Sequence, residues 1–511
     1  MDFESDVEEY GQMEDHISPP GSLGSRITVQ SSRYSGIARD SSPTLSQHLQ
    51  QPSVHSVPPA RNNVKLRSEL RAERDSPNAQ LIKLVTLICI FFVDSYNISL
   101  IGYIGVLAYD PLDPLAKGAH FVAIGTVLGL IVGCVLFAFL AEHYGRVSMF
   151  RSTLIITALF SAACALAYPI DGSVYYLLVP FRLLLGLGIG GDYPLVACIA
   201  KESEWPSGAG RRLGLVYLGQ GFGPIVCGGI ILLLLAFHTS EIHAGRAAML
   251  FPLIPLFASA IPRLHMKEGR EYFRDQADER LSSRLNSLLH EQWKQLLGTS
   301  LSWFFLDLYY YGISLYTPTV ISSLGCGVDH EDACSVRDII EFQVIISALS
   351  FPGYIFSAVF STRISQYYIQ AAGFCMCGLV FGVLAIFYGR LSSHRGLFMG
   401  LFVIIHFFSN FGPNFTTFSI PASTFSIQHR SLAVGLSAGV GHVGALIALF
   451  VFEPLLQWSI RAAMLGSSVA AILGLLSTLL FISRSEHGHM LEEKLERQSL
   501  TSQTNLIQYS T

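Results

Sequence analysis

Charged residues are scarce in this chain of 511 residues. Only 14% of them are Asp, Glu, Lys or Arg, whereas about 25% is usual for a soluble globular protein. Hydrophobic residues make up 51% of the chain, and they fall in blocks of roughly 20, the length of a helix that crosses a bilayer. The shortage of charge therefore excludes an ordinary soluble domain and predicts an all-α membrane protein.

Motifs of ATP-driven pumps and of soluble enzymes are also missing. The chain contains no Walker-type glycine loop, no metal-ligand spacing and no nucleophile–base signature. The glycine-rich stretch at 186–191 follows an apolar helix rather than a strand, so it does not indicate a dinucleotide site. We therefore expect no enzyme activity, no metal and no cofactor.

Composition divides the chain into five segments. Residues 1–76 are rich in Ser, Pro and Gln and predict a disordered tail. Six apolar blocks in 77–262 and six more in 297–482 predict 12 transmembrane helices in two six-helix, pseudo-symmetric bundles. A basic loop at 263–296 joins the bundles, and a charged tail follows at 483–511.

Basic residues predict the orientation in the membrane. Lys and Arg concentrate in the loop 263–296 and near Lys201, whereas the opposite loops carry acidic residues such as Asp110, Asp171 and Glu331. The positive-inside rule then places both tails and the central loop in the cytoplasm. The first apolar block begins behind a long polar tail, so we expect no cleavable secretory signal.

Seven of the nine cysteines lie in the apolar blocks and are expected to be core residues. Cys326 and Cys334 instead flank an acidic loop on the predicted outer side, where the oxidising environment permits a disulfide. The sequence leaves open whether these two cysteines pair.

Asp192 and Asp307 each place a carboxylate at membrane depth inside an apolar block, which costs about 2.5–3.5 kcal/mol on insertion scales. Asp192 follows a Gly-Ile-Gly-Gly run, and Asp307 lies between Trp303 and Tyr311 at a spacing that puts all three on one helix face. Each carboxylate also has a purely structural explanation. Asp192 could be a protonated residue in a helix contact made of small residues, and Asp307 could be a single Asp in a stripe of packed aromatic residues. The recurrence of polar groups along the chain favours a shared cavity instead.

Other polar residues lie at matching depths. Asn414 directly follows a Gly-Pro pair, and it could bind either an anion or the carbonyls that the proline frees. Gln220 lies in a similar stretch, three residues before Gly-Pro at 223–224. His442 is flanked by small residues that leave room around it, and it is either a core residue or a cavity group that titrates near physiological pH. Arg182 lies ten residues before Asp192, too far for a local pair.

A weak internal repeat supports two related halves. Phe-Phe-Val-Asp-Ser-Tyr at 91–96 is similar to Phe-Phe-Leu-Asp-Leu-Tyr at 304–309, which puts Asp94 and Asp307 at corresponding places. Two six-helix halves around a central site form a transporter architecture.

Over roughly residues 80–482 the chain resembles major facilitator superfamily transporters, and specifically the phosphate:proton symporter family of fungi and plants. The most specific matches are Gly-Gly-Asp-Tyr-Pro-Leu at 190–195, the stretch 409–417, and Gln220 in its glycine-rich setting. The Glu-His-Tyr-Gly-Arg stretch at 142–146 resembles the superfamily's loop between the second and third spans.

The resemblance implies a major facilitator fold driven by a proton gradient. It implies a substrate site formed by Tyr193, Gln220, Trp303, Asp307, Tyr311 and Asn414, with His442 where the family has Lys. It implies proton coupling through Asp94, Asp192 and Asp307, with Arg182 paired to an acidic group, and a gating loop that contains Glu142, Gly145 and Arg146.

Two departures from the family bear on the substrate. Asn97 replaces a second first-span Asp and cannot titrate, and His442 replaces a permanent cation by a conditional one. We predict a proton-coupled secondary transporter of phosphate or a phosphate-containing small molecule. A transporter of a specialised metabolite or another organic anion is the alternative, and a non-transporting nutrient sensor is a third hypothesis.

The expected partners are a small anionic solute, protons and the lipid bilayer, with no nucleic acid and with the oligomeric state left open. The resemblance makes the plasma membrane the default location. All of this requires that ionisable and amide side chains, among them Asp192, Asp307 and His442, converge on one water-accessible cavity in the middle of the bilayer.

Overall fold

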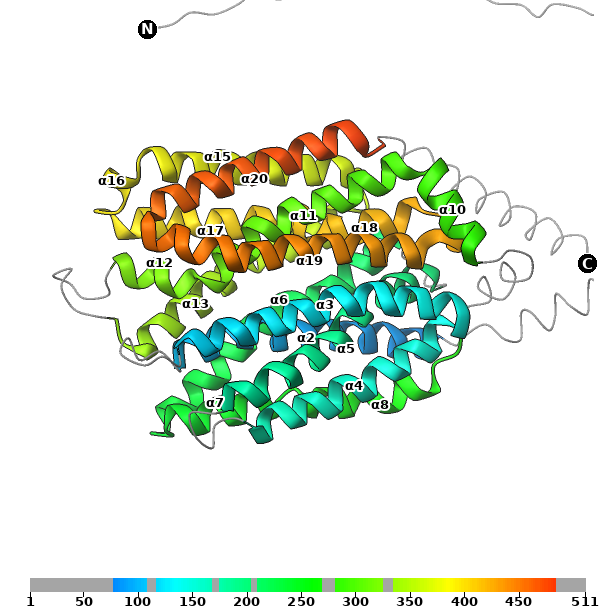
Figure 1. Ribbon diagram of the computed structural model, residues 1–511, viewed down its shortest axis with the longest axis horizontal. Coiled ribbons are helices and arrows are strands. Elements are labelled where there is room, and N and C mark those ends of the chain that lie inside the picture. The colour runs from blue at the N-terminus through cyan, green and yellow to red at the C-terminus, as the bar shows by residue number, and fades with distance from the viewer. Residues whose placement is uncertain are drawn as a thin grey trace, which may run out of the picture. The chain divides into compact units, whose positions relative to one another are not determined.

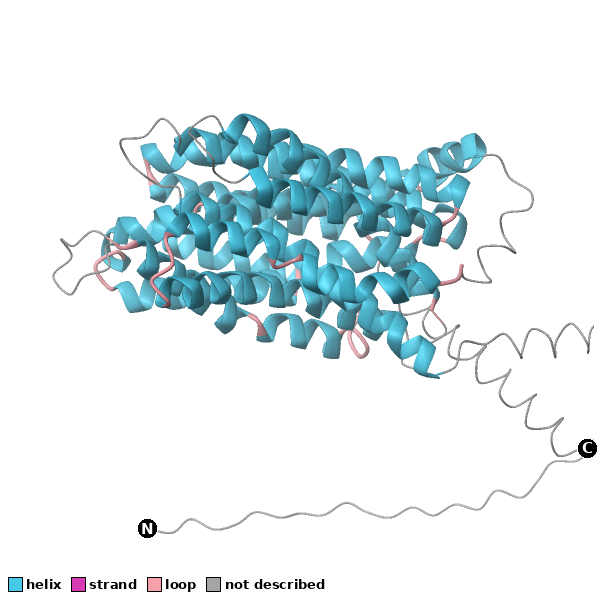
Figure 2. Ribbon diagram, turned by 90° about the horizontal axis from the view of Figure 1, so that it is seen from below, coloured by secondary structure: helices cyan, strands magenta, loops and turns pink. Residues whose placement is uncertain are grey.

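The computed structural model describes residues 77–107, 116–167, 174–203, 209–268, 281–324 and 334–483. Within these ranges all regular structure is helical (Figure 2). Eleven stretches in this described part are long and apolar enough to cross a membrane. The predicted all-α membrane fold is confirmed; the N-terminal tail and most of the C-terminal tail lie outside the described residues.

The first half of the described chain folds into six spanning segments, the last of which is built from two helices. They are α2 (Pro77–Leu107), α3 (Ala116–Tyr144), α4 (Arg146–Ala167), α5 (Val174–Glu202), α6 (Ala209–Ala236), and α7 (Glu241–Leu250) with α8 (Leu253–His265).

The second half begins after the short linker helix α10 (Leu281–Glu291). Its helices are α11 (Trp293–Leu315), α12 (Thr317–Leu324), α13 (Val336–Ser350), α14 (Pro352–Phe360), α15 (Gln366–Ile386), α16 (Tyr388–Leu391), α17 (Arg395–Phe411), α18 (Pro413–Thr424), α19 (Ile427–Trp458) and α20 (Ile460–Phe481).

Prolines divide three of the spanning segments. Pro252 separates α7 from α8, Pro352 begins α14, and Gly412 with Pro413 separates α17 from α18. Proline has no N–H to continue the helix and its ring clashes with the preceding turn. The kink predicted at the Gly-Pro pair of the tenth span is therefore confirmed.

The seventh segment, α11, is absent from the eleven apolar stretches. Its inward face carries Trp303 and Asp307, which are buried, together with Tyr311, so its composition is more polar than that of the other spans. A helix that lines a polar cavity on one side does not need the uniform apolar surface that lipid demands of the others.

The helices of the two halves form two groups, the first coloured blue to green and the second green to red (Figure 1). The groups touch where α19 crosses α3: a Cβ atom at Gly435 would lie 2.2 Å from the Cβ atom of Ala138. We call the end at which α3 and α5 finish and α4, α11 and α19 begin the linker face, because α10 lies there (Figure 1).

Glycines let α5 pack directly on α3. A Cβ atom at Gly190 would lie 2.3 Å from the carbonyl oxygen of Leu130, and one at Gly129 would lie 2.0 Å from that of Leu183. The Gly-Gly pair before Asp192 therefore serves helix packing rather than the approach of a substrate.

Arg263, assigned to the basic loop because of its charge, lies instead in the last turn of α8 and is 0% exposed. A fully buried guanidinium must be paired inside the protein. Farther along the linker, Leu288 of α10 is buried against Leu296 and Leu432, which anchors α10 to the second half.

Candidate functional site

A cavity of about 140 Å³ lies between the two halves. The first half contributes Ser95, Ile98, Ser99, Gly102, Tyr103, Tyr193, Tyr217, Gln220, Gly221 and Pro224. The second half contributes Trp303, Asp307, Tyr310, Tyr311, Ser314, Leu315, Thr317, Gln343, Ile346, Ser347, Ser350, Tyr354, His406, Asn410, Asn414 and His442. The lining reaches from the middle of α5 and α19 to the end of α11 that is remote from the linker face.

All seven residues predicted to surround the substrate line this cavity. At its centre, Nδ1 of His442 lies 2.9 Å from Oδ2 of Asp307, and both side chains are at most 5% exposed. The His442 ring is also surrounded by aromatic rings, with centroids 5.4 Å from Tyr193 and 6.3 Å from both Trp303 and Tyr311. His442 and Asp307 thus form a buried, hydrogen-bonded imidazole–carboxylate pair.

The small residues beside His442 do not leave empty space, contrary to the expectation from sequence. A Cβ atom at Gly441 would lie 2.4 Å from Cδ1 of Trp303, and one at Gly444 would lie 2.3 Å from the carbonyl oxygen of Phe304. These glycines let α19 pack on α11, and this contact is what brings His442 to Asp307.

Asn414 connects the two halves through hydrogen bonds. The hydroxyl of Tyr217 in α6 donates to its Oδ1 at 2.8 Å, while its Nδ2 donates to Oδ1 of Asn410 at 3.0 Å and to the hydroxyl of Tyr354 at 3.3 Å. Gln220 lies near this group in the lining, and its buried Oε1 has no hydrogen-bond partner among the described residues. Such an acceptor is available to a protonated ligand oxygen.

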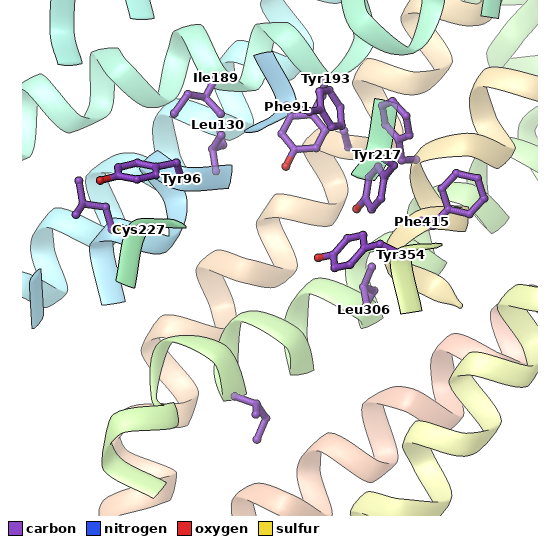
Figure 3. Close-up of a cluster of buried hydrophobic side chains, with 14 of the residues drawn as sticks. Phe91, Tyr96, Leu130, Ile189, Tyr193, Tyr217, Cys227, Leu306, Tyr354 and Phe415 are labelled. Carbon is purple, nitrogen blue, oxygen red and sulfur yellow. The ribbon is translucent and has the colours of Figure 1, made fainter. Parts of the chain in front are cut away.

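Aromatic rings from both halves close the cavity toward the linker face, and we call this group the aromatic plug. It consists of Phe91, Tyr193, Tyr217, Tyr354, Phe415 and Phe418, five of which are labelled in Figure 3. The rings of Phe91 and Phe418 lie 5.0 Å apart and those of Tyr217 and Tyr354 lie 5.8 Å apart, so each contact joins one half to the other.

Ion pairs at the linker face hold the halves together beyond the plug. Glu202 at the end of α5 forms an ion pair with Arg146, and its Oε1 lies 2.7 Å from Nη1 of Arg430 in α19. Nη2 of Arg146 also donates to the carbonyl oxygen of Ile427 at 2.8 Å. Arg146, predicted to belong to a gating loop, thus contacts the second half directly.

The rest of the predicted gating loop binds the linker. Oε2 of Glu142 lies 3.1 Å from Nη1 of Arg284 in α10. Gly145 has a φ of +93°, and a Cβ atom there would lie 2.6 Å from Oε1 of Glu268. That oxygen accepts a hydrogen bond of 2.6 Å from the backbone N–H of Val147, at the start of α4, while burial raises the pKa of the Glu268 carboxyl.

Residues 84–419 match the Major Facilitator Superfamily. The chain belongs to this superfamily. It is similar to Inorganic phosphate transporter PHO84 of Saccharomyces cerevisiae, at 29% identity over 70% of this chain and 73% of the relative. It is also similar to Low affinity inorganic phosphate transporter 5 of Petunia hybrida, at 28% identity over 79% of this chain and 89% of the relative.

Two solved structures share the fold. The proton:xylose symporter XylE, bound to a bromo-deoxyglucose, covers 80% of this chain with a TM-score of 0.65 at 12% identity, and 96% of its own chain is matched. FucP in the outward conformation covers 79% with a TM-score of 0.60 at 15% identity, and its whole chain is matched. The chain is therefore a multi-pass membrane transporter of the major facilitator fold and not an enzyme.

The residues predicted to couple protons in this transporter do not all share the cavity. Asp307 lines it, but Asp94 and Asp192 do not. Oδ1 of Asp192 lies 2.6 Å from Nη2 of Arg263, in a buried cluster behind the cavity wall. The expectation that Asp192 joins Asp307 and His442 in one cavity is wrong, because Asp192 points toward α4 and α8.

Arg182 is 1% exposed, and its Nη1 donates a hydrogen bond of 2.9 Å to the carbonyl oxygen of Asn97. The sequence predicts that it pairs with an acidic group.

On the predicted outer side Cys334 is disulfide-bonded, and its proposed partner Cys326 lies outside the described residues. Among the described residues, no group of three His, Cys, Asp or Glu side chains is placed to hold a metal ion.

Several lining residues of this transporter were not found from the sequence, notably Tyr217, Tyr310, Tyr354, Asn410 and His406. Helical spacing could have indicated three of them. Tyr217 lies three residues before Gln220, Tyr310 lies three residues after Asp307, and Asn410 lies four residues before Asn414, so each stands at helical spacing from a predicted residue. Tyr354 and His406 stand in aromatic stretches where no periodicity separates cavity from core.

Proposed function

We propose that this protein transports phosphate across a membrane together with protons, by alternating access to the cavity between its halves. The sequence relatives named above are inorganic phosphate transporters. The observation that carries the proposal is the Asp307–His442 pair at the centre of a small polar cavity.

The size of the cavity favours inorganic phosphate over a bulky metabolite. Pockets for drug-sized ligands measure about 300–1,000 Å³, whereas this one measures about 140 Å³. A cavity of roughly 150 Å³ in an engineered protein holds benzene, a molecule of similar size to phosphate. A specialised metabolite would need the halves to move apart before it could enter.

The charge of the cavity favours a singly charged anion. No lysine or arginine is among its described lining residues, and Asp307, His406 and His442 are the titratable groups there besides the tyrosines. When Asp307 and His442 are both protonated, the pair carries one positive charge and attracts an anion. Loss of protons from the pair removes that charge and favours release, which links phosphate movement to proton movement.

We place the linker face in the cytoplasm, since basic residues collect in the linker. The cavity then faces outward, with the aromatic plug and the Arg146–Glu202–Arg430 ion pairs closing the cytoplasmic side. Inward opening would require both to separate. By similarity to the relatives, we assign the protein to the plasma membrane.

Phosphate uptake into liposomes that contain the purified protein tests this proposal. An acidic outer solution should drive accumulation of phosphate, and Asp307→Asn should abolish it because the central pair loses its carboxyl group. Glycerol phosphate and unphosphorylated glycerol serve as competing solutes. Uptake of an organic solute without phosphate would contradict the proposal, and so would phosphate binding without any flux, which is the outcome expected of a sensor.

Replacement of His442 by Lys tests the conditional cation. A lysine at this position would keep its positive charge at alkaline pH, whereas an imidazole is a cation only when it is protonated. We expect His442→Lys to bind phosphate about tenfold more tightly at alkaline pH, the gain of one charged hydrogen bond. Calorimetric titration across pH measures this, and an unchanged pH profile would show that His442 does not face phosphate.

A further inference from the structure

A second cluster of ionisable groups lies behind the wall of the cavity, inside the first half. Asp94 of α2, Asp192 of α5 and Arg263 of α8 are all buried, with exposed fractions of 3%, 1% and 0%. Nη2 of Arg263 lies 2.6 Å from Oδ1 of Asp192, and the hydroxyl of Thr153 in α4 donates to the same oxygen at 2.5 Å. Asp94 is close enough to interact electrostatically with both ionisable partners.

The charges of this cluster balance only if it binds one proton. Two carboxyl groups face one guanidinium, and an unpaired buried carboxylate costs several kcal/mol. Neither oxygen of Asp94 has a hydrogen-bond partner among the described residues, whereas Asp192 has two donors. The proton therefore belongs on Asp94 in this conformation, and Asp192 carries the charge that Arg263 neutralises.

One N–H group of Arg263 remains available to donate a hydrogen bond to a second carboxylate. Its Nε donates to the carbonyl oxygen of Phe150 at 2.6 Å and its Nη2 binds Asp192, but its buried Nη1 has no partner among the described residues. Once Asp94 loses its proton, the two carboxylates compete for this one guanidinium. Besides Asp192 and Arg263, two titratable groups interact with Asp94: the thiol of Cys89, which also interacts with Ser259 of α8, and the phenol of Tyr193.

The cluster is connected to the cavity and to the linker face. Ser95 and Tyr193, the next residues after Asp94 and Asp192, line the cavity. Three residues beyond Arg263, the carbonyl oxygen of Met266 accepts a hydrogen bond of 2.6 Å from Arg151 in α4. A shift of the guanidinium toward Asp94 would thus change the positions of residues both at the cavity wall and at the end of α8.

We infer that Arg263 is a positioning residue for proton coupling. Its fixed positive charge neutralises the Asp94 carboxylate after the proton has left, and it withdraws when the proton returns. The proton comes from water onto the Asp94 carboxylate and leaves it again as a proton, with no other bond made or broken. When Asp94 is protonated, Asp192 is the only carboxylate that forms an ion pair with Arg263. When Asp94 is deprotonated, both carboxylates interact with Arg263. This inference rests on the proposed phosphate transport, since it assigns the coupling and not the substrate.

Two assays on the same liposomes separate coupling from transport. Phosphate exchange at equal pH on both sides needs only the cavity, whereas accumulation against a phosphate gradient needs the proton. We expect Arg263→Gln to retain exchange and to lose accumulation roughly tenfold or more, within the usual range of coupling between sites. Arg263→Lys keeps the charge and should retain both activities.

A second variant keeps the test valid if Arg263→Gln does not fold. Asp192→Asn combined with Arg263→Gln removes both partners of the pair and leaves no unpaired charge, and it should show the same split between exchange and accumulation. Equal losses in both assays would mean that Arg263 is only structural, and normal accumulation would mean that it takes no part in coupling. Absence of phosphate exchange in the natural protein would instead contradict the proposed transport itself.

Discussion

Asp94 and Asp307 occupy corresponding places in the repeated Phe-Phe-x-Asp motif of the two halves, yet their surroundings differ. Asp307 faces the cavity and is paired with His442, whose charge depends on pH. Asp94 lies behind the cavity wall, near Asp192 and the permanently charged Arg263. The aspartate of the repeated motif therefore lies near a conditional cation, His442, in the second half and near a fixed cation, Arg263, in the first half.

The difference shows how one fold can separate two tasks. A conditional cation suits a site that must bind and release an anion, because the attraction disappears with the proton. A fixed cation suits a site that must respond to a proton without binding a solute, because the guanidinium stays charged and can only move. The two sites adjoin through Tyr193, whose ring lies 5.4 Å from that of His442.

The largest effect is expected on the stability of the protein when each cation loses its aspartate partner. Asp192→Asn removes the carboxylate that is bonded to the buried Arg263 and leaves only the unbonded Asp94 carboxyl near it, so it should lower the free energy of unfolding by up to about 3–5 kcal/mol. Asp307→Asn leaves an imidazole that can become neutral, so we expect a loss of about 1 kcal/mol. Unfolding of the two purified variants measures this, and equal losses would remove the distinction between the sites.

A smaller effect is expected from the glycines that bring each site together. A Cβ atom at Gly191 would lie 2.5 Å from Cδ2 of Phe137, and one at Gly441 would lie 2.4 Å from Cδ1 of Trp303. Each change to Ala should destabilise the protein by about 1–3 kcal/mol through overpacking. Only Gly441→Ala should also weaken phosphate binding, since Trp303 lines the cavity.

Gly229→Ala and Gly400→Ala are matched controls, because a Cβ atom at either position meets nothing within 4 Å. Neither change should lower stability or weaken binding, and the higher helix propensity of Ala should stabilise each variant by at most about 1 kcal/mol. Weaker phosphate binding in Gly191→Ala would show that the cluster of the first half is not separate from the cavity.

The smallest effect concerns Glu268, which titrates outside the membrane and must be separated from the two sites. Burial raises the pKa of this carboxyl in the folded protein. Its contribution to stability is then fully present below the unfolded pKa of about 4.3 and is lost as the pH rises through the folded pKa. Thermal unfolding from acidic to neutral pH should show this decline in the natural protein, and Glu268→Gln should lack it.

Much of the candidate site could be predicted from polar residues in apolar blocks, since a buried polar group must have a partner or a ligand. Asp307, Gln220, Asn414 and His442 were found in this way. The place of Asp192 could not be predicted, because the face of a helix that meets lipid, cavity or another helix depends on its neighbours. Arg263 was missed as a site residue because basic residues after a span usually lie in a loop.

The sequence by itself determined that this chain crosses a membrane many times as helices, because only helices of about 20 apolar residues satisfy their backbone groups in lipid. It also identified Asp94, Asp192, Asp307 and His442 as ionisable groups inside the apolar blocks, but it did not identify Arg263. The tertiary structure alone decided that His442 meets Asp307 and that Arg263 meets Asp192, because these pairs come from helices far apart in the chain. Their approach depends on glycine contacts such as that of Gly441 with Trp303, which no local pattern encodes.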